Sequence, residues 1–259
     1  MHVNRIIVRA VLAGCLLSVA GYLGFQRTRD KCAQWIGEVI CRVEVEQRVV
    51  ALSFDDGPTA VGVSEVLPVL ARYNVHATFF LIGEDTARNP ALVRRIQLAG
   101  HELGNHSYSH SIMIGGSAAN YNAEIRRTDA LLRQAGADPT LFRPPGGRRF
   151  IGLPLAVEHN GYRMITWSAV DEPWARITPS EYAAHMLAQV RPGAILLMHP
   201  MNEHFAASRA ALPLILEGLK RRGYRVTTVS GLIRLGEVER SRSRLSGIAS
   251  RPTSAAAPD

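Results

Sequence analysis

Two adjacent carboxylates, Asp55 and Asp56, are the first residues of this chain whose placement suggests chemistry. They follow the apolar run 49–54, which predicts a buried strand, and they precede a Gly-Pro pair that ends it. Neighbouring carboxylates repel each other and burial disfavours both charges, so the arrangement is costly without a cation. A turn that closes the strand explains the same residues. The stretch alone does not separate a cation site from a turn.

Two histidines, His106 and His110, add a second candidate group. A spacing of four residues puts both imidazoles on one face of a helical turn. Together with Asp56 they provide the two-histidine, one-carboxylate set that binds a divalent metal and leaves positions open for substrate. A bound cation would also remove the repulsion between the paired carboxylates.

The elements that must position these residues alternate between strands and helices from Arg48 to about Leu235. The patterns predict strands over 49–54, 76–82, 162–167, 194–198 and 224–229, and helices over 64–73, 90–100, 119–134, 153–160, 182–190 and 210–221. Repeated β-α units imply parallel strands joined by right-handed crossovers. The number of strands favours a barrel, complete or incomplete, over an open sheet.

Chemically capable residues stand at the ends of five strand-like runs. These residues are Asp55, His106, Arg143, Trp167 and His199. In β/α barrels the chemistry gathers at the carboxyl ends of the strands. The sequence therefore predicts one cleft at that end of the barrel.

Four motifs in order carry a resemblance to a known family. SFDDGP at 53–58, HSYSH at 106–110, FRPPG at 142–146 and LMH at 197–199 resemble the motifs of the polysaccharide deacetylase (NodB-homology) family, carbohydrate esterase family 4. The match covers roughly residues 49–235. It implies an α/β fold, a distorted and incomplete (β/α) barrel. It also implies metal-dependent removal of N- or O-acetyl groups, with N-acetyl favoured and O-acetyl left open, from a cell-envelope or extracellular polysaccharide.

By position, the resemblance implies a metal bound by Asp56, His106 and His110. Asp55 would be the general base, and Arg143 the charge partner that keeps it ionised. Zn²⁺ is the expected ion, although Co²⁺, Fe²⁺, Mn²⁺ and Ni²⁺ also suit such ligands. Metal-bound water acquires a pKa of about 7, which suits hydrolysis.

The same resemblance implies that His199 is the general acid for the leaving group. Leu197 and Trp167 would line an acetyl pocket, although residues of these types are more often simple core. The backbone N–H of Tyr108 or of a neighbour is a candidate donor to the oxyanion.

One departure from the family pattern concerns the partner of His199. Family members commonly carry Asp-Trp a few residues after the strand tryptophan, and that aspartate orients the acid. Here Pro173 precedes the matching tryptophan. We expect Asp171 to take the role, with Glu172 as the weaker candidate.

The two ends of the chain are expected to lie outside the catalytic domain, which we place at 48–235. Residues 1–31 read as an N-terminal signal peptide or signal anchor, because two arginines precede an uncharged apolar run. Signal-peptide cleavage, lipidation at Cys15 and retention as an anchor remain alternatives, with retention favoured. Each one exports the domain to a periplasmic or extracytoplasmic space. Residues 32–47 form a linker in which export permits a Cys32–Cys41 disulfide, and 236–259 read as a disordered tail.

The net charge of +8 does not indicate a nucleic-acid partner, because the basic residues are scattered without an aromatic platform. Attraction to an acidic envelope or membrane surface explains the excess. The rival function is a catalytically weak, metal-containing carbohydrate-binding module of the same fold. Asp55 and His199 argue against it, because binding alone needs neither residue. A two-histidine, one-carboxylate iron oxygenase is disfavoured by the β-α pattern and the remaining motifs.

Overall fold

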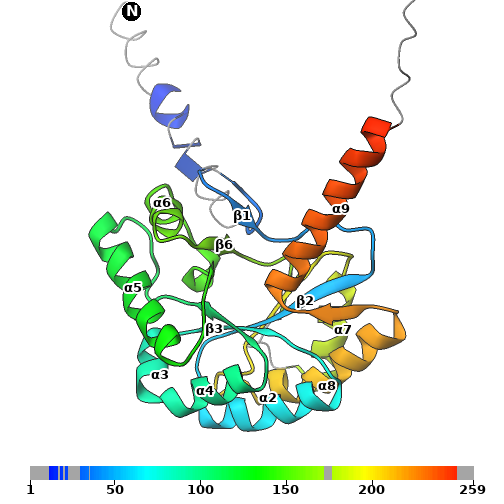
Figure 1. Ribbon diagram of the computed structural model, residues 1–259. Helices are drawn as coiled ribbons and strands as arrows, with labels where there is room; N and C mark the ends of the chain where they lie inside the picture. The colour runs from blue at the N-terminus through cyan, green and yellow to red at the C-terminus, as the bar shows by residue number, and fades with distance from the viewer. Residues whose placement is uncertain are drawn as a thin grey trace, which may run out of the picture.

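The computed structural model describes residues 12–16, 18–19, 21–22, 30–34, 36–171 and 177–249, with the backbone alone for 246–249 (Figure 1). Most of the expected targeting segment, Glu172 and the end of the expected tail lie outside these residues. No helix within the described ranges is long and apolar enough to cross a membrane.

A curled parallel sheet of nine strands forms the centre of the fold. Its strands are β1 (Val39–Ile40), β2 (Val49–Asp55), β3 (Thr78–Leu81), β4 (Glu102–Asn105), β5 (Leu141–Phe142), β6 (Arg163–Ile165), β7 (Ala169–Val170), β8 (Ile195–Met198) and β9 (Arg225–Thr227). They follow the order β1-β6-β5-β4-β3-β2-β8-β7, and β9 pairs with β2. Among the described residues β1 and β7 do not pair with each other, so the barrel stays open. The predicted incomplete barrel is confirmed.

Helices cover the outer side of the sheet, except the last one, whose buried residues Val229, Leu232 and Ile233 pack with the side chains inside the barrel (Figure 1). They are α2 (Ala60–Arg72), α3 (Gly83–Arg88), α4 (Pro90–Leu98), α5 (Ala118–Gln134), α6 (Gly152–His159), α7 (Pro179–Gln189), α8 (Ala206–Arg221) and α9 (Val229–Ala249). Their starts follow capping chemistry: the Thr59 side chain accepts from the Gly62 N–H at α2, and Thr178 forms a capping box with Glu181 at α7. The six predicted helices are confirmed to within a few residues, whereas α3 and α9 were not predicted.

Strand β2 is the hub of the sheet and is buried along its whole length. Its first half pairs with β9, its second half with β3, and its middle with β8. Alternation sends Val50, Leu52 and Phe54 to the core under the helices, and Val49 and Ala51 to the core inside the barrel. The period of two therefore turns Asp55, at the end of the strand, toward the barrel interior.

The folded domain begins earlier than predicted. Residues 32–47, expected to be a linker, contain β1, which pairs with β6 and buries Val39 and Ile40. The structure also has the Cys32–Cys41 disulfide. A strand of two residues carries no periodic pattern, so the sequence did not reveal it.

The folded domain also ends later than predicted. Helix α9 continues past Leu235 to Ala249, in place of the tail expected from 236 (Figure 1). Its contacts are tertiary: the Glu239 carboxylate accepts from the Glu46 N–H at 2.8 Å and from the Gln47 amide at 2.9 Å. A Cβ on Gly236 would lie 2.3 Å from the Val43 side chain, so the glycine permits close packing there.

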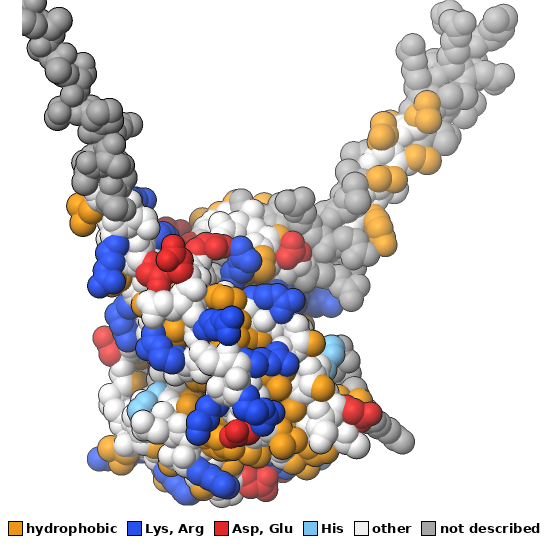
Figure 2. Space-filling view, turned by 90° about the vertical axis from the view of Figure 1, so that its right-hand side faces the viewer, with side chains coloured by type: hydrophobic (Ala, Val, Ile, Leu, Met, Phe, Trp, Pro, Cys, Tyr) orange, Lys and Arg blue, Asp and Glu red, His pale blue; other side chains and the backbone are white. Residues whose placement is uncertain are grey.

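Basic side chains outnumber acidic ones on the face that Figure 2 shows, where they spread over the surface without forming one compact patch. This distribution agrees with the net charge of +8.

Candidate active site

A cavity of about 660 Å³ opens at the carboxyl ends of the strands. It is lined by Lys31, Asp55, Asp56, His106, His110, Gly146, Trp167, Val170, Asp171, His199, Asn202 and Phe205. Four of the five residues predicted to meet at the strand ends line this cavity, and the fifth, Arg143, lies buried behind Asp55. The cleft predicted from the strand ends is therefore present in the structure.

Arg143 holds the Asp55 carboxylate in place. Its Nη1 donates to Asp55 Oδ1 at 2.6 Å, and its Nη2 donates to Ser53 Oγ at 2.8 Å and to the Thr166 carbonyl at 3.3 Å. The guanidinium lies over the Phe80 ring, with Cζ 4.0 Å from the ring centre. Burial alone would raise the pKa of Asp55, but the charge of Arg143, with that of His199 and the hydrogen bond from Arg143, outweighs burial and lowers that pKa. Asp55 is therefore ionised at neutral pH.

Asp56, His106 and His110 bring ligand atoms within 4.8 Å of one another. Asp56 Oδ1 lies 3.4 Å from His110 Nε2 and 3.9 Å from His106 Nε2. This oxygen is buried and has no hydrogen-bond partner among the described residues. An orphaned carboxylate oxygen beside two imidazole nitrogens fits a divalent cation.

The tautomer of His106 also suits a metal ligand. Its Nδ1 lies 2.7 Å from the Arg143 carbonyl oxygen, which can only accept, so Nδ1 carries the hydrogen. Burial lowers the pKa of His106 and keeps the ring neutral. The Nε2 lone pair therefore faces Asp56 and His110.

The loop that carries the two histidines is not the helical turn that their spacing predicted. Ser107 and His110 have positive φ angles of 63° and 56°. The Asn105 side chain accepts from the Ser107 N–H at 3.0 Å, and the Ser107 hydroxyl accepts from the His110 N–H at 3.1 Å. Side-chain bonds of this kind compete with helix formation. They bring the two imidazole rings to a centroid distance of 4.9 Å by another route.

Two residues predicted to bind substrate do not line the cavity. The Tyr108 N–H, expected to face an oxyanion, donates to Glu124 Oε2 at 2.9 Å, and so does the Ser109 N–H. Leu197 is 1% exposed and belongs to the core inside the barrel. Trp167 does line the cavity.

Asp171 is the partner of His199, as the sequence analysis expected. Its Oδ1 lies 2.7 Å from His199 Nδ1, and its Oδ2 accepts from the His199 N–H at 2.8 Å. Asp171 Oδ2 also accepts from the hydroxyls of Tyr182 and Ser208. Burial would lower the pKa of His199, but the bond to Asp171 and the charges of Asp171, Asp55 and Asp56 raise it to about 9. The alternative partner, Glu172, lies outside the described residues.

Several residues around the site escaped the sequence analysis. Phe205 lines the cavity with its ring 6.4 Å from that of His199, whereas the adjacent His204 is exposed and does not line it. The position of Phe205 shortly after the LMH motif was an available signal. Tyr182 and Ser208 lie in helices α7 and α8, where no motif marks them. Lys31 precedes every strand, and only the tertiary fold brings it to the cleft.

Sequence comparison identifies relatives of known activity. Residues 42–165 match the sequence model of the polysaccharide deacetylase family. A peptidoglycan-N-acetylglucosamine deacetylase of Bacillus cereus is 34% identical over 200 residues, which make up 76% of this chain and 94% of the relative.

Solved structures of proteins with related names have the same fold as this chain. A peptidoglycan N-acetylglucosamine deacetylase in complex with a naphthalenyl N-oxidanyl-benzamide superposes with a TM-score of 0.71 at 31% identity, over 75% of this chain and 92% of that one. A mutant of a Bacillus anthracis pseudoenzyme of carbohydrate esterase family 4, with restored enzymatic activity, gives a TM-score of 0.72 at 28% identity, over 76% of this chain and 72% of that one. The chain belongs to the polysaccharide deacetylase family and is a hydrolase.

Proposed function

We propose that this enzyme removes N-acetyl groups from amino sugars of a cell-envelope polysaccharide, with a divalent metal ion, Zn²⁺ first among candidates. The names of its relatives support an N-acetylated amino-sugar polymer such as peptidoglycan over an O-acetylated one. The N-terminal segment before Asp30 would export the domain, as a cleaved signal peptide or as a retained anchor. Because Lys31 lines the cavity, any cleavage must fall before it. Cell fractionation with a C-terminal tag tests export, and recovery of the full-length chain in the cytoplasm contradicts it.

Asp56, His106 and His110 would hold the metal. When bound, such an ion polarises an acetyl carbonyl and lowers the pKa of water at the site. The orphaned Asp56 oxygen and the neutral His106 ring support this assignment.

Asp55 would act as the general base. Arg143 keeps it ionised at neutral pH and fixes its Oδ1, so Oδ2 is the oxygen that remains to accept a proton from the attacking water. A guanidinium does not lose its proton in proteins, so Arg143 is an electrostatic partner and not an acid.

His199 would act as the general acid. Asp171 binds its Nδ1–H, and His199 lines the cavity, where its Nε2 would protonate the leaving amine. The amine must leave as a neutral group, and the acid supplies the proton it needs. The aromatic side chains of Trp167 and Phe205 form an apolar part of the wall of the same cavity.

One observation carries the proposal: the cavity is lined by a carboxylate kept ionised and by an imidazole kept protonated, beside a metal-ligand set. Pairs of titratable groups whose environments push their pKa values apart mark acid and base roles. A binding module needs neither group, so this pair favours the enzyme over the carbohydrate-binding alternative.

The test is acetate release by the full-length chain after chelation and after addition of Zn²⁺. N-acetylated and O-acetylated glycans of the same backbone are compared, with Asp55→Asn as the inactive variant and Asp138→Asn, on the exposed surface, as its matched control. We expect Zn²⁺-dependent acetate from the N-acetylated glycan in the parent and in Asp138→Asn. Acetate that does not depend on metal contradicts the mechanism, and a preference for O-acetyl contradicts the substrate assignment.

A further inference from the structure

A segment outside the family match contributes one wall of the cleft. The family model matches from residue 42, whereas Lys31, in the segment Asp30–Cys41, lines the catalytic cavity. The Cys32–Cys41 disulfide closes this segment on itself.

The backbone around Lys31 is held by buried side chains. Arg149, which is 5% exposed, donates from Nη2 to the carbonyl oxygens of Asp30 and Lys31, each at 3.1 Å, and of Ala33 at 2.5 Å. The Thr166 hydroxyl donates to the Lys31 carbonyl at 2.5 Å. A buried arginine committed to three carbonyls fixes the path of the segment beside the cleft.

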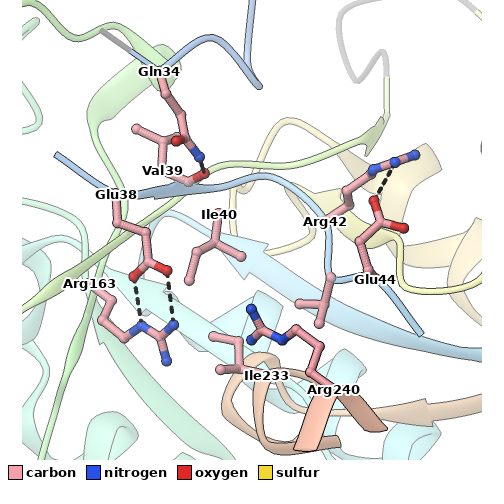
Figure 3. Close-up of a pocket in the computed structure, with 10 residues that line it drawn as sticks. Gln34, Glu38, Val39, Ile40, Arg42, Glu44, Arg163, Ile233 and Arg240 are labelled. Atoms are coloured by element: carbon pink, nitrogen blue, oxygen red, sulfur yellow. Dashed lines mark hydrogen bonds and ion pairs between the residues drawn. The ribbon is translucent and has the colours of Figure 1, made fainter. Parts of the chain in front are cut away.

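Hydrogen bonds and an ion pair also hold the second part of the segment, from Gln34 to Val39 (Figure 3). The Gln34 amide donates to the Val39 carbonyl at 2.9 Å, and the Glu38 carboxylate accepts twice from Arg163, at 3.1 and 3.2 Å. Figure 3 shows these residues around a separate hollow of about 180 Å³. The disulfide, Arg149 and the Glu38–Arg163 pair together keep the position of Lys31 constant.

The Lys31 ammonium lies at the wall formed by Gly146 and Trp167. Nζ donates to the Gly146 carbonyl at 2.6 Å and stands 4.9 Å from the Trp167 ring centre. Of the three carboxylates in the lining, Asp55 is already paired with Arg143, and the other two offset only part of the charge of the His199 imidazolium and a divalent cation. Lys31 adds a further positive charge, so the loaded cleft favours an anionic ligand.

We propose that Lys31 is a specificity-determining residue that recognises a carboxylate substituent on the glycan, close to the acetylated sugar. The inference rests on the proposed function and narrows its substrate class to an acidic, carboxylate-bearing amino-sugar polymer. An ammonium and a carboxylate form a charge-assisted hydrogen bond that a neutral glycan cannot form.

The test compares two substrates that differ in charge alone. One is an N-acetylated amino-sugar oligosaccharide with free carboxylates, and the other is the same oligosaccharide with those groups converted to methyl esters. Lys220 is the only other lysine of the chain and is exposed at the end of α8, so Lys220→Gln is the matched control for Lys31→Gln.

We expect the parent to prefer the free acid by about tenfold in kcat/KM, mainly through KM, which corresponds to about 1.4 kcal/mol. Lys31→Gln removes the preference, Lys31→Arg keeps most of it, and Lys220→Gln keeps all of it. Added salt reduces the preference in the parent because it screens the charge. Replacing both Cys32 and Cys41 by Ser weakens the preference, because the segment is then held less firmly.

A binding measurement keeps this inference separate from the proposed function. Calorimetric titration of the Zn²⁺-loaded, inactive Asp55→Asn protein with both oligosaccharides, with and without Lys31→Gln, should show the same dependence on Lys31. No acetate from either substrate would contradict the proposed function, while binding would still test Lys31. Equal kcat/KM and equal binding for acid and ester in the parent overturn the inference. An equal loss on both substrates in Lys31→Gln also overturns it, because Lys31 would then only support Gly146 and Trp167.

Discussion

Replacement of Asp171 by Asn should move the alkaline limit of activity. The substitution keeps the size of a side chain that is 1% exposed but removes its negative charge. Asp171 is the strongest influence that raises the pKa of His199 against the effect of burial. Without Asp171, only the charges of Asp55 and Asp56 raise the pKa of His199 against the lowering effect of burial.

The size of the effect follows from the pKa of His199, about 9 in place of its ordinary value of 6.5. This difference corresponds to about 3 kcal/mol of preference for the protonated ring. The acid works when protonated, so activity falls as pH rises through this pKa. If the pKa returns to about 6.5, the protonated fraction at pH 8 falls from about 90% to about 3%, a loss of about thirtyfold in kcat. A bound divalent cation repels the imidazolium in both proteins and lowers both values, so the direction of the difference persists.

The assay is kcat against pH from about 5.5 to about 10 at saturating Zn²⁺, for the parent, Asp171→Asn and Tyr182→Phe. Tyr182→Phe removes a hydroxyl donor to Asp171 but keeps the charge, so it controls for damage to the network. We expect the alkaline limb of Asp171→Asn to lie about two pH units below that of the parent, with unchanged metal content. The limb of Tyr182→Phe should not move to lower pH. Coincident limbs in the parent and Asp171→Asn would show that the His199 proton does not set the alkaline limit.

Three further predictions follow from the same contacts. Asp55→Asn should keep its metal after dialysis and lose activity by about a hundredfold or more, whereas Asp56→Asn should lose the metal. Metal content is measured by mass spectrometry, and an equal loss of metal in the two variants refutes the division of roles. Arg143→Met leaves Asp55 buried without its partner, and urea denaturation should show a loss of about 3–5 kcal/mol; a loss below about 1 kcal/mol contradicts a buried pair. The His199 pKa is raised on folding, so its stabilisation is complete below about pH 6.5 and is lost as pH rises to about 9. The free energy of unfolding of the metal-free protein should fall by about 3 kcal/mol over this interval, and His199→Gln should abolish that slope.

The sequence predicted the residues at the strand ends because their signal is local. Asp55, His106 and His199 each follow a short apolar run, and the β-α alternation brings such ends to one edge of the barrel. The partner of His199 could also be predicted from the sequence, because Asp171 follows Trp167 by only a few residues. These inferences needed only short-range pattern and one rule of topology.

The remaining features depend on contacts between distant segments. Tyr108 was placed at an oxyanion because the sequence does not show that Glu124 captures its N–H. Leu197 was placed in the pocket because strand alternation alone does not show which core a residue joins. Lys31 reaches Gly146 across 115 residues, a contact that no local pattern encodes.

The three partners of β2 also set an order of assembly. β3 and β4 follow β2 closely in the chain, and they bring Asp56, His106 and His110 together. β8, which carries His199 at its end, pairs with β2 across a far longer separation, and β9 across a longer one still. Contacts that close longer loops cost more chain entropy and form later. A refolding chain should therefore acquire its metal ligands before its general acid, so metal uptake in stopped-flow refolding should precede the return of activity. On this proposal, early folding intermediates would bind metal without hydrolysing substrate, and simultaneous recovery of both properties would refute the order.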